Sequence, residues 1–268
     1  IDHIQCGKLD CDRDGGEFSG ANLGLYSVTY LNDLKQDKRT LEAFHAFREE
    51  AERKQFRYFL EVFDPNIESG IPPEKLGEFI NDQILRTLAG IAEAGRPDFL
   101  KIVYHGPRLM EEICQYDPNL IVGVLGGSAG TTYDAFRLLH DAKKHGARVA
   151  LYGRKINNAE HQLAFIEFLR LIAEDTIGPE EAVHAYHGVL QGKGITPKLS
   201  LEQDLELTEQ SMRYSDTDGK PSVAIRNNPL AKRKQPSATW PTKPGGTPDF
   251  ASMTPSQRLA YHTTRLKK

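Results

Sequence analysis

The chain has 268 residues, a formal net charge of -3 at pH 7 and 26% charged residues. This length allows one large domain or two small ones, and the charge argues against a general nucleic-acid-binding protein. No stretch approaches the roughly 20 apolar residues of a membrane span, and no signal peptide is recognisable. Because the first residue is Ile1 rather than a methionine, we expect further sequence to precede it.

The three cysteines are typical of a reducing compartment. Cys6, Cys11 and Cys114 are an odd set without CxxC spacing. This pattern favours neither a disulfide framework nor a zinc site. We therefore expect a cytoplasmic protein.

The amino-terminal part is predicted to hold one strand, one long loop and one helix. Residues 1–9 predict a first strand, with Lys8 near its carboxyl end. Residues 17–38 contain glycine, asparagine and aromatic residues that suit a loop over a site. The charge-rich run 38–54 has the apolar spacing of a surface helix.

Two central strands carry one charged residue each. Residues 57–63 predict a strand in which Glu61 shares a face with apolar side chains, so it needs a partner: it is a structural carboxylate, a site acid or base, or the ion partner of a lysine. Residues 99–107 predict a strand with Lys101 in its middle. Burial disfavours the charged amine and makes it a usable nucleophile. The alternative is an edge-strand lysine whose amine reaches solvent.

Two later strands, 119–125 and 148–154, end in residues typical of phosphate binding. The first runs into a glycine-rich turn and a helix over 131–145, so backbone N–H groups and the helix amino terminus would face an anion. A tight turn without a ligand is the alternative there. The second ends in an arginine, which can bind phosphate as a bidentate fork. The residues concerned are Gly126, Gly127, Ser128, Gly153 and Arg154.

The alternation of strands with helices predicts an α/β fold with parallel strands. Its chemically interesting residues follow strand ends, which in a TIM barrel meet at one face, with a phosphate site after the last two strands. A doubly wound sheet would place its glycine-rich turn after the first strand. A complete barrel takes about 250 residues. We therefore expect a (β/α)8 barrel that lacks its amino-terminal strands. Further helices are predicted over 72–95, 108–116, 160–174 and 179–190.

The carboxyl-terminal part changes in composition. We expect a barrel domain over 1–195, then a helix and an extended tail over 196–268 that is rich in Pro, Lys, Ser, Thr and Gly. Trp240 and Phe250 are candidate anchors with which the tail wraps the domain or a neighbouring subunit. A homo-oligomer is therefore expected.

Residues 56–156 resemble the carboxyl-terminal half of class I aldolases of the deoxyribose-phosphate and tagatose-bisphosphate superfamily. The resemblance implies that Lys101 is the Schiff-base lysine, and it places the glycines and the arginine named above at the substrate phosphate. By position, Lys8 resembles a second site lysine and Glu61 a carboxylate of the preceding strand. The matching segments are Phe59-Leu-Glu-Val62, Phe99-Leu-Lys-Ile102, Val124-Leu-Gly-Gly-Ser128, Gly146-Ala147 and Tyr152-Gly-Arg-Lys-Ile156.

The resemblance implies a carbon–carbon lyase that acts on a phosphorylated sugar without cofactor or metal. Lys101 would form the imine, helped by Lys8, and Glu61 would transfer protons or hold Lys8. Tyr104 is a weaker acid candidate. Two alternatives stay open: a non-covalent sugar-phosphate isomerase or epimerase barrel, and a non-catalytic barrel that binds a sugar phosphate. No nucleic acid or membrane partner is expected.

Overall fold

A computed structural model describes residues 1–9, 11, 19–127, 130–208, 241, 248–254, 257–258 and 261. The chain divides into a unit Ile1–Ala224 and a unit Ile225–Lys268. In the second unit the ring of Phe250 packs edge-on against Tyr261, with 5.0 Å between the ring centroids. Trp240 lies outside the described residues. The boundary at residue 195, the wrapping tail and the homo-oligomer stay predictions.

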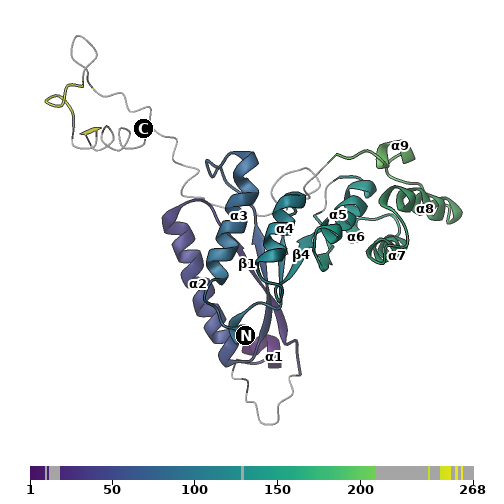
Figure 1. Cartoon of the computed structure of the whole chain (residues 1–268), viewed down its shortest axis with the longest axis horizontal. Coiled ribbons are helices and arrows are strands. Elements are labelled where there is room, and N and C mark those ends of the chain that lie inside the picture. Colours follow the sequence, from purple (N-terminus) through teal and green to yellow (C-terminus); the bar gives the residue numbers. More distant parts are fainter. Residues whose placement is uncertain are drawn as a thin grey trace. The chain divides into compact units, whose positions relative to one another are not determined.

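The first unit is built on a five-stranded parallel sheet in which the strands stand in chain order (Figure 1). The strands are β1 (Leu23–Thr29), β2 (Arg57–Phe63), β3 (Phe99–Ile102), β4 (Ile121–Leu125) and β5 (Val149–Leu151). The helices are α1 (Asp2–Cys6), α2 (Leu34–Arg53), α3 (Pro73–Leu88), the 3-10 turn η1 (Glu93–Gly95), α4 (Pro107–Tyr116), α5 (Thr132–Lys144), α6 (Arg154–Asn157), α7 (Gln162–Ala173), α8 (Pro179–Gly192) and α9 (Leu201–Asp204).

The helices α2 to α5 cover one face of this sheet. Connections between parallel strands are right-handed, so strands that always add on the same side carry their helices on the same face. The even-numbered strand residues form the core with these helices. In β2, β3 and β4 they are buried Tyr58, Leu60, Val62, Leu100, Ile102, Val122 and Val124.

The opposite face of the sheet carries the odd-numbered strand residues. At β1 no described element of this unit covers that face, and Leu23 and Leu25 are 40% and 49% exposed there. In a (β/α)8 barrel this face is the interior. A doubly wound sheet would instead reverse its strand order and carry helices on both faces. The predicted α/β fold is therefore confirmed as part of a barrel, and the described sheet is not closed.

Local sequence explains where the helices begin. Proline occupies the first helical position of α3, α4 and α8, where its missing N–H costs nothing. The side chain of Asp33 caps α2, and Thr131 and Asp134 form a reciprocal capping box at the start of α5.

Two predictions for the amino-terminal part are wrong. The strand expected over residues 1–9 is the short helix α1, and the loop expected over 17–38 contains β1 and the first turn of α2. Gly24 lies within β1, and its glycine made this stretch resemble a loop in the sequence. A Cβ atom there would lie 2.6 Å from the ring of Phe56, so the strand needs glycine at this point.

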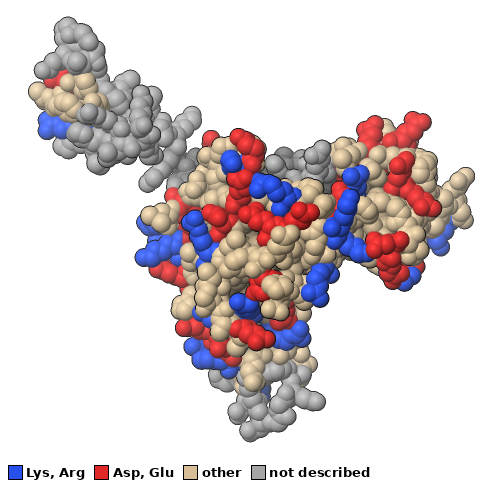
Figure 2. Space-filling model, viewed as in Figure 1, with Lys and Arg blue, Asp and Glu red and all other residues tan. Residues whose placement is uncertain are grey.

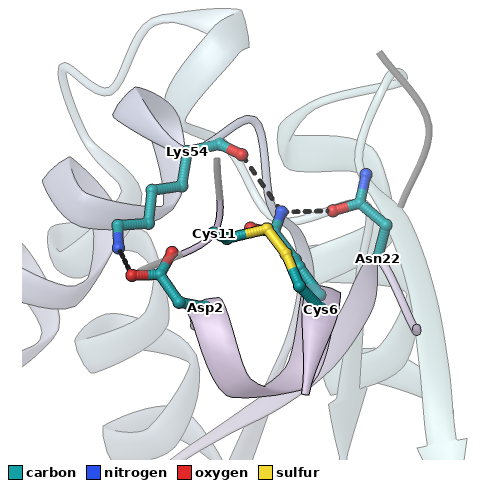
Figure 3. Close-up of a disulfide and its surroundings, with 6 residues drawn as sticks. Asp2, Cys6, Cys11, Asn22 and Lys54 are labelled. Carbon is teal, nitrogen blue, oxygen red and sulfur yellow. Dashed lines mark hydrogen bonds and ion pairs between the residues drawn. A yellow bond between two sulfur atoms is a disulfide. The ribbon is translucent and has the colours of Figure 1, made fainter. Parts of the chain in front are cut away.

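A local disulfide links Cys6 to Cys11, whose Cα atoms are 5.8 Å apart (Figure 3). Beside it the amine of Lys54 pairs with the carboxylate of Asp2. The cysteine count and spacing predicted no disulfide framework and did not reveal this pair. Because disulfides are rare in reducing compartments, the pair does not support the compartment inferred from the cysteines, and a cytoplasmic location stays a prediction.

Charges of both signs are intermingled over α2 and α3 on the face shown in Figure 2. Within the described residues, no helix is both long enough and apolar enough to cross a membrane.

Candidate active site

Lys101 and Glu61 form a buried ion pair on the face of the sheet that carries the odd-numbered strand residues. The strand register sets the two residues side by side on β3 and β2, and Nζ of Lys101 lies 2.5 Å from Oε1 of Glu61. The distance is that of an ion pair, although the angle falls outside hydrogen-bond geometry. The Glu61 side chain is 3% exposed and the Lys101 side chain 18%. The carboxylate can accept the proton that an amine must lose before it attacks a carbonyl carbon.

The neighbours of the pair on this face include an aromatic stack and a glycine. Two residues earlier on the same face, the rings of Phe59 and Phe99 stack with their centroids 4.6 Å apart. On β4 the residue in register with Lys101 is Gly123, which has no side chain because a Cβ would lie 2.7 Å from the carbonyl oxygen of Leu100. The glycine therefore presents no side chain beside Lys101, and its backbone is closely approached by Leu100 and Val149.

Lys8 is not brought to this pair. It is exposed and follows α1, which is bonded to the segments that precede β1 and β2. Leu23, where β1 begins, lies four residues before Ser27, the residue in register with Glu61, which is about 13 Å along the strand. The predicted role of Lys8 as a second site lysine depended on a strand that does not exist.

In the glycine-rich turn after β4, Gly126 is held by a backbone hydrogen bond and by close packing. The N–H of Gly126 donates to the carbonyl of Leu151 at 3.1 Å and so extends the ladder between β4 and β5. A Cβ at Gly126 would lie 2.2 Å from the ring of Tyr152. Gly127 adopts a positive φ of 55°, which glycine tolerates best. Ser128 lies outside the described residues.

The segment after β5 turns at once into α6. Gly153 is exposed and precedes the helix, and Arg154 is its first residue. The next residue, Lys155, reaches back and donates to the carbonyl of Gly130 at 2.6 Å. Burial lowers the pKa of Lys155, the carboxylates of Asp204 and others opposing this effect. The ends of β4 and β5 are therefore tied together.

The amino terminus of α5 does not present free donors in the way the sequence suggested. The N–H of Thr131 donates to the Asp134 carboxylate at 2.8 Å, and the N–H of Asp134 donates to the Thr131 hydroxyl at 3.1 Å. The N–H of Thr132 donates to Oδ1 of Asp204 at 2.6 Å. An anion at this end of the sheet would thus depend on the preceding loop rather than on these three groups.

A second pair at the strand ends was missed by the sequence reasoning. Asp64 directly follows β2, and its Oδ1 lies 2.8 Å from Nε2 of His105, which follows β3. Both side chains are 13% exposed. The rule that functional residues follow strand ends would have singled out both. Tyr104, by contrast, belongs to the core on the helix-covered face, opposite Lys101, and burial raises its pKa to about 12.

Metal-binding clusters are not found in the described part of the chain, where no three His, Cys, Asp or Glu side chains gather in a suitable arrangement.

No protein-family model matches the chain. No curated protein matches it either. Among solved structures, similar backbones include an archaeal fructose 1,6-bisphosphate aldolase (16% identity, 57% of this chain and 58% of that chain covered, TM-score 0.46). Another is a Schiff-base-forming fructose-1,6-bisphosphate aldolase (21% identity, 59% and 59% covered, TM-score 0.47). A third is the fructose-bisphosphate aldolase of Slackia heliotrinireducens (18% identity, 74% and 58% covered, TM-score 0.45). The chain thus spans less than two thirds of the length of each of these structures.

Proposed function

We propose that the chain is a class I aldolase that cleaves a phosphorylated sugar through a Schiff base on Lys101. The observation that carries this proposal is the Lys101–Glu61 pair. It combines a largely buried amine and a buried carboxylate 2.5 Å apart on the face that forms the interior of a barrel. One of the similar solved structures is, by its name, a Schiff-base-forming aldolase; the proposal itself stands on the two residues.

The proposed reaction begins when Lys101 gives a proton to Glu61 and attacks the carbonyl carbon of the sugar. The carbonyl oxygen leaves as water and an iminium forms. Glu61 returns its proton to the departing water and then takes the proton of the substrate hydroxyl next to the bond to be broken. The iminium takes up the electron pair of the breaking carbon–carbon bond, so an aldehyde is released and an enamine remains. Protonation and hydrolysis of the enamine release the second product and restore the amine. Glu61 is the proposed proton carrier.

The phosphate of the substrate is proposed to bind at the carboxyl ends of β4 and β5. Gly127, Gly153 and Arg154 are the proposed contacts, and Ser128 belongs to the same proposal. Gly126 would act by shaping the turn, since its N–H is already bonded. Binding energy from a remote phosphate orients the reacting carbon over the amine. The resemblance makes tagatose bisphosphate the first sugar to test.

The test is the intact mass of the protein after incubation with dihydroxyacetone phosphate and borohydride, which reduces and traps an imine. We expect an adduct on the wild type and none on Lys101→Met. Lys38→Met is the control and should still form the adduct, because the Lys38 side chain is 72% exposed and remote from Lys101 in sequence. Absence of an adduct on the folded wild type, with deoxyribose 5-phosphate tried as well, would reject the imine.

The second candidate is a non-covalent sugar-phosphate isomerase or epimerase. The tight ion pair favours it in one respect, because a charged Lys101 would stabilise an enolate without a covalent bond. Turnover of a sugar phosphate with no trapped adduct would select this candidate.

A further inference from the structure

The strand register places three polar side chains side by side on the face of the sheet that carries Lys101. At the level of Lys101 it aligns one residue from each strand, in the order Ser27, Glu61, Lys101, Gly123 and Val149. The polar side chains at this level therefore come from β1, β2 and β3, whereas β4 and β5 supply a glycine and a valine.

The two neighbouring layers of the same face are apolar with one exception. In the layer toward the strand starts the residues are Leu25, Phe59, Phe99 and Ile121. In the layer toward the carboxyl ends they are Thr29, Phe63, Leu125 and Leu151. Within these three layers of the described strands, β1 alone contributes hydroxyl groups, at Ser27 and Thr29.

The hydroxyls of Ser27 and Thr29, here called the β1 hydroxyls, have no hydrogen-bond partner among the residues that the structure describes. Ser27 is exposed and Thr29 is half-buried. Each hydroxyl can donate one hydrogen bond and accept two. Two such groups on an otherwise apolar face are suited to bind the hydroxyl groups of a sugar.

The position of the amine decides on which side of Lys101 those sugar hydroxyls lie. Nζ of Lys101 lies 2.5 Å from Oε1 of Glu61, which is on the β1 side of β3. Neighbouring strands are about 4.8 Å apart, so Ser27 lies beside Glu61 and about 10 Å from the strand of Lys101. On the β4 side the backbone of Gly123 is closely approached by its neighbours and carries no side chain. A carbonyl carbon held by the amine thus has its polar neighbours toward β1.

We propose that the β1 hydroxyls bind the hydroxyl groups of the aldehyde half of the substrate, and that Ser27 makes the site selective for a 2-hydroxyaldehyde. In the proposed cleavage Glu61 takes the proton of the hydroxyl on the carbon that becomes the aldehyde. The next hydroxyl along the sugar then lies opposite Ser27, and the one after it lies opposite Thr29. This inference rests on the proposed Schiff base at Lys101 and assigns a substrate class to the same site.

The experiment measures the reverse reaction, in which the enamine of dihydroxyacetone phosphate adds to an aldehyde. Lactaldehyde and propanal are the matched acceptors, because they differ only in the hydroxyl on the second carbon. The wild type should prefer lactaldehyde. Ser27→Ala should lower kcat/KM for lactaldehyde about tenfold, the scale of one lost hydrogen bond, and leave kcat/KM for propanal unchanged.

Three further variants separate the hydroxyl from other effects of a change in β1. Ser27→Thr keeps the hydroxyl and should retain the preference for lactaldehyde. Leu25→Ala removes an apolar side chain, 49% exposed, from the same face of the same strand, and it should not alter the preference. Thr29→Val should instead lower the preference for glyceraldehyde, which carries one more hydroxyl, over lactaldehyde.

The proposal would be overturned by a wild type that adds lactaldehyde no faster than propanal, or by a Ser27→Ala variant that loses equally with both acceptors or keeps the preference. Borohydride trapping with dihydroxyacetone phosphate shows which claim has failed. No adduct on the folded wild type rejects the Schiff base and this inference with it. A normal adduct on Ser27→Ala together with an unchanged preference rejects the assignment of Ser27 alone.

Discussion

Removing Lys101 should destabilise the protein more than removing Glu61, and removing both should restore most of the loss. Glu61 is 3% exposed and its only described partner on this face is Lys101. Removing one partner of a buried ion pair, so that the other charge stays buried without a counter-ion, lowers the free energy of unfolding by about 3 kcal/mol or more. In Lys101→Met the carboxylate is left without its cation. In Glu61→Leu the amine, 18% exposed, can reach solvent, so that change costs about 1 kcal/mol.

The assay is urea unfolding of the wild type, the two single variants and the double variant at pH 7. We expect the double variant within about 1 kcal/mol of wild type, which gives a coupling free energy of about 2–3 kcal/mol. The exposed pair Lys38–Glu42 on α2, with 72% and 63% exposed side chains, is the control and should show no measurable coupling. A Lys101→Met variant as stable as wild type, or a double variant that simply adds the two losses, would refute the reasoning.

Further predictions concern buried groups and glycines. Burial raises the pKa of Tyr104 from 10 to about 12, so the phenol stays neutral in the folded protein at a pH where it ionises in the unfolded chain. The contribution of the neutral phenol to the free energy of unfolding is therefore complete below pH 10 and is lost as the pH rises from about 10 to 12. Urea unfolding between pH 9 and 11.5 should show a smaller loss of stability for Tyr104→Phe than for the wild type. At pH 7 the same variant should be neutral or up to about 1 kcal/mol more stable, since the described residues offer the hydroxyl no hydrogen bond; a clear destabilisation would contradict this. Gly126→Ala should lower the free energy of unfolding by about 1–3 kcal/mol through its contact with Tyr152, whereas Gly153→Ala, which meets nothing within 4 Å, should not; equal thermal shifts would refute the packing argument. Burial raises the pKa of the Cys114 thiol to about 11, so alkylation of the native protein should be slow at pH 8 and accelerate toward pH 11.

The central part of the fold could be predicted because its signals are local. Buried strands and amphipathic helices between residues 57 and 190 show their period directly in the sequence, and the structure confirms that each exists. Three of them are shorter than predicted: the helix expected over 72–95 ends at Leu88, the strand expected over 99–107 ends at Ile102, and the strand expected over 148–154 spans Val149–Leu151. Alternation within β2 and β3 placed Glu61 and Lys101 on definite faces. What it could not give was the register, which depends on pairing across strands and which makes these two residues partners of each other instead of partners of Lys8.

The amino-terminal and long-range features could not be predicted for different physical reasons. β1 is an edge strand whose glycine is demanded by the ring of Phe56, a contact that no local pattern records. The capping of Thr132 by Asp204 joins residues 72 positions apart. Sequence reasoning assumed free N–H groups at the start of α5, because a glycine-rich turn before a helix usually offers them. Only the fold shows that the chain itself supplies the acceptor.

The measurement that tests the account most directly is the position of the trapped adduct. After borohydride reduction in the presence of a phosphorylated sugar, peptide mass mapping of the wild type should find the modification on Lys101 alone, and Glu61→Gln should slow its formation because the proton acceptor is lost. A modification on Lys155 or another lysine, or none on protein that binds the sugar, would contradict the assignment of Lys101 as the Schiff-base residue.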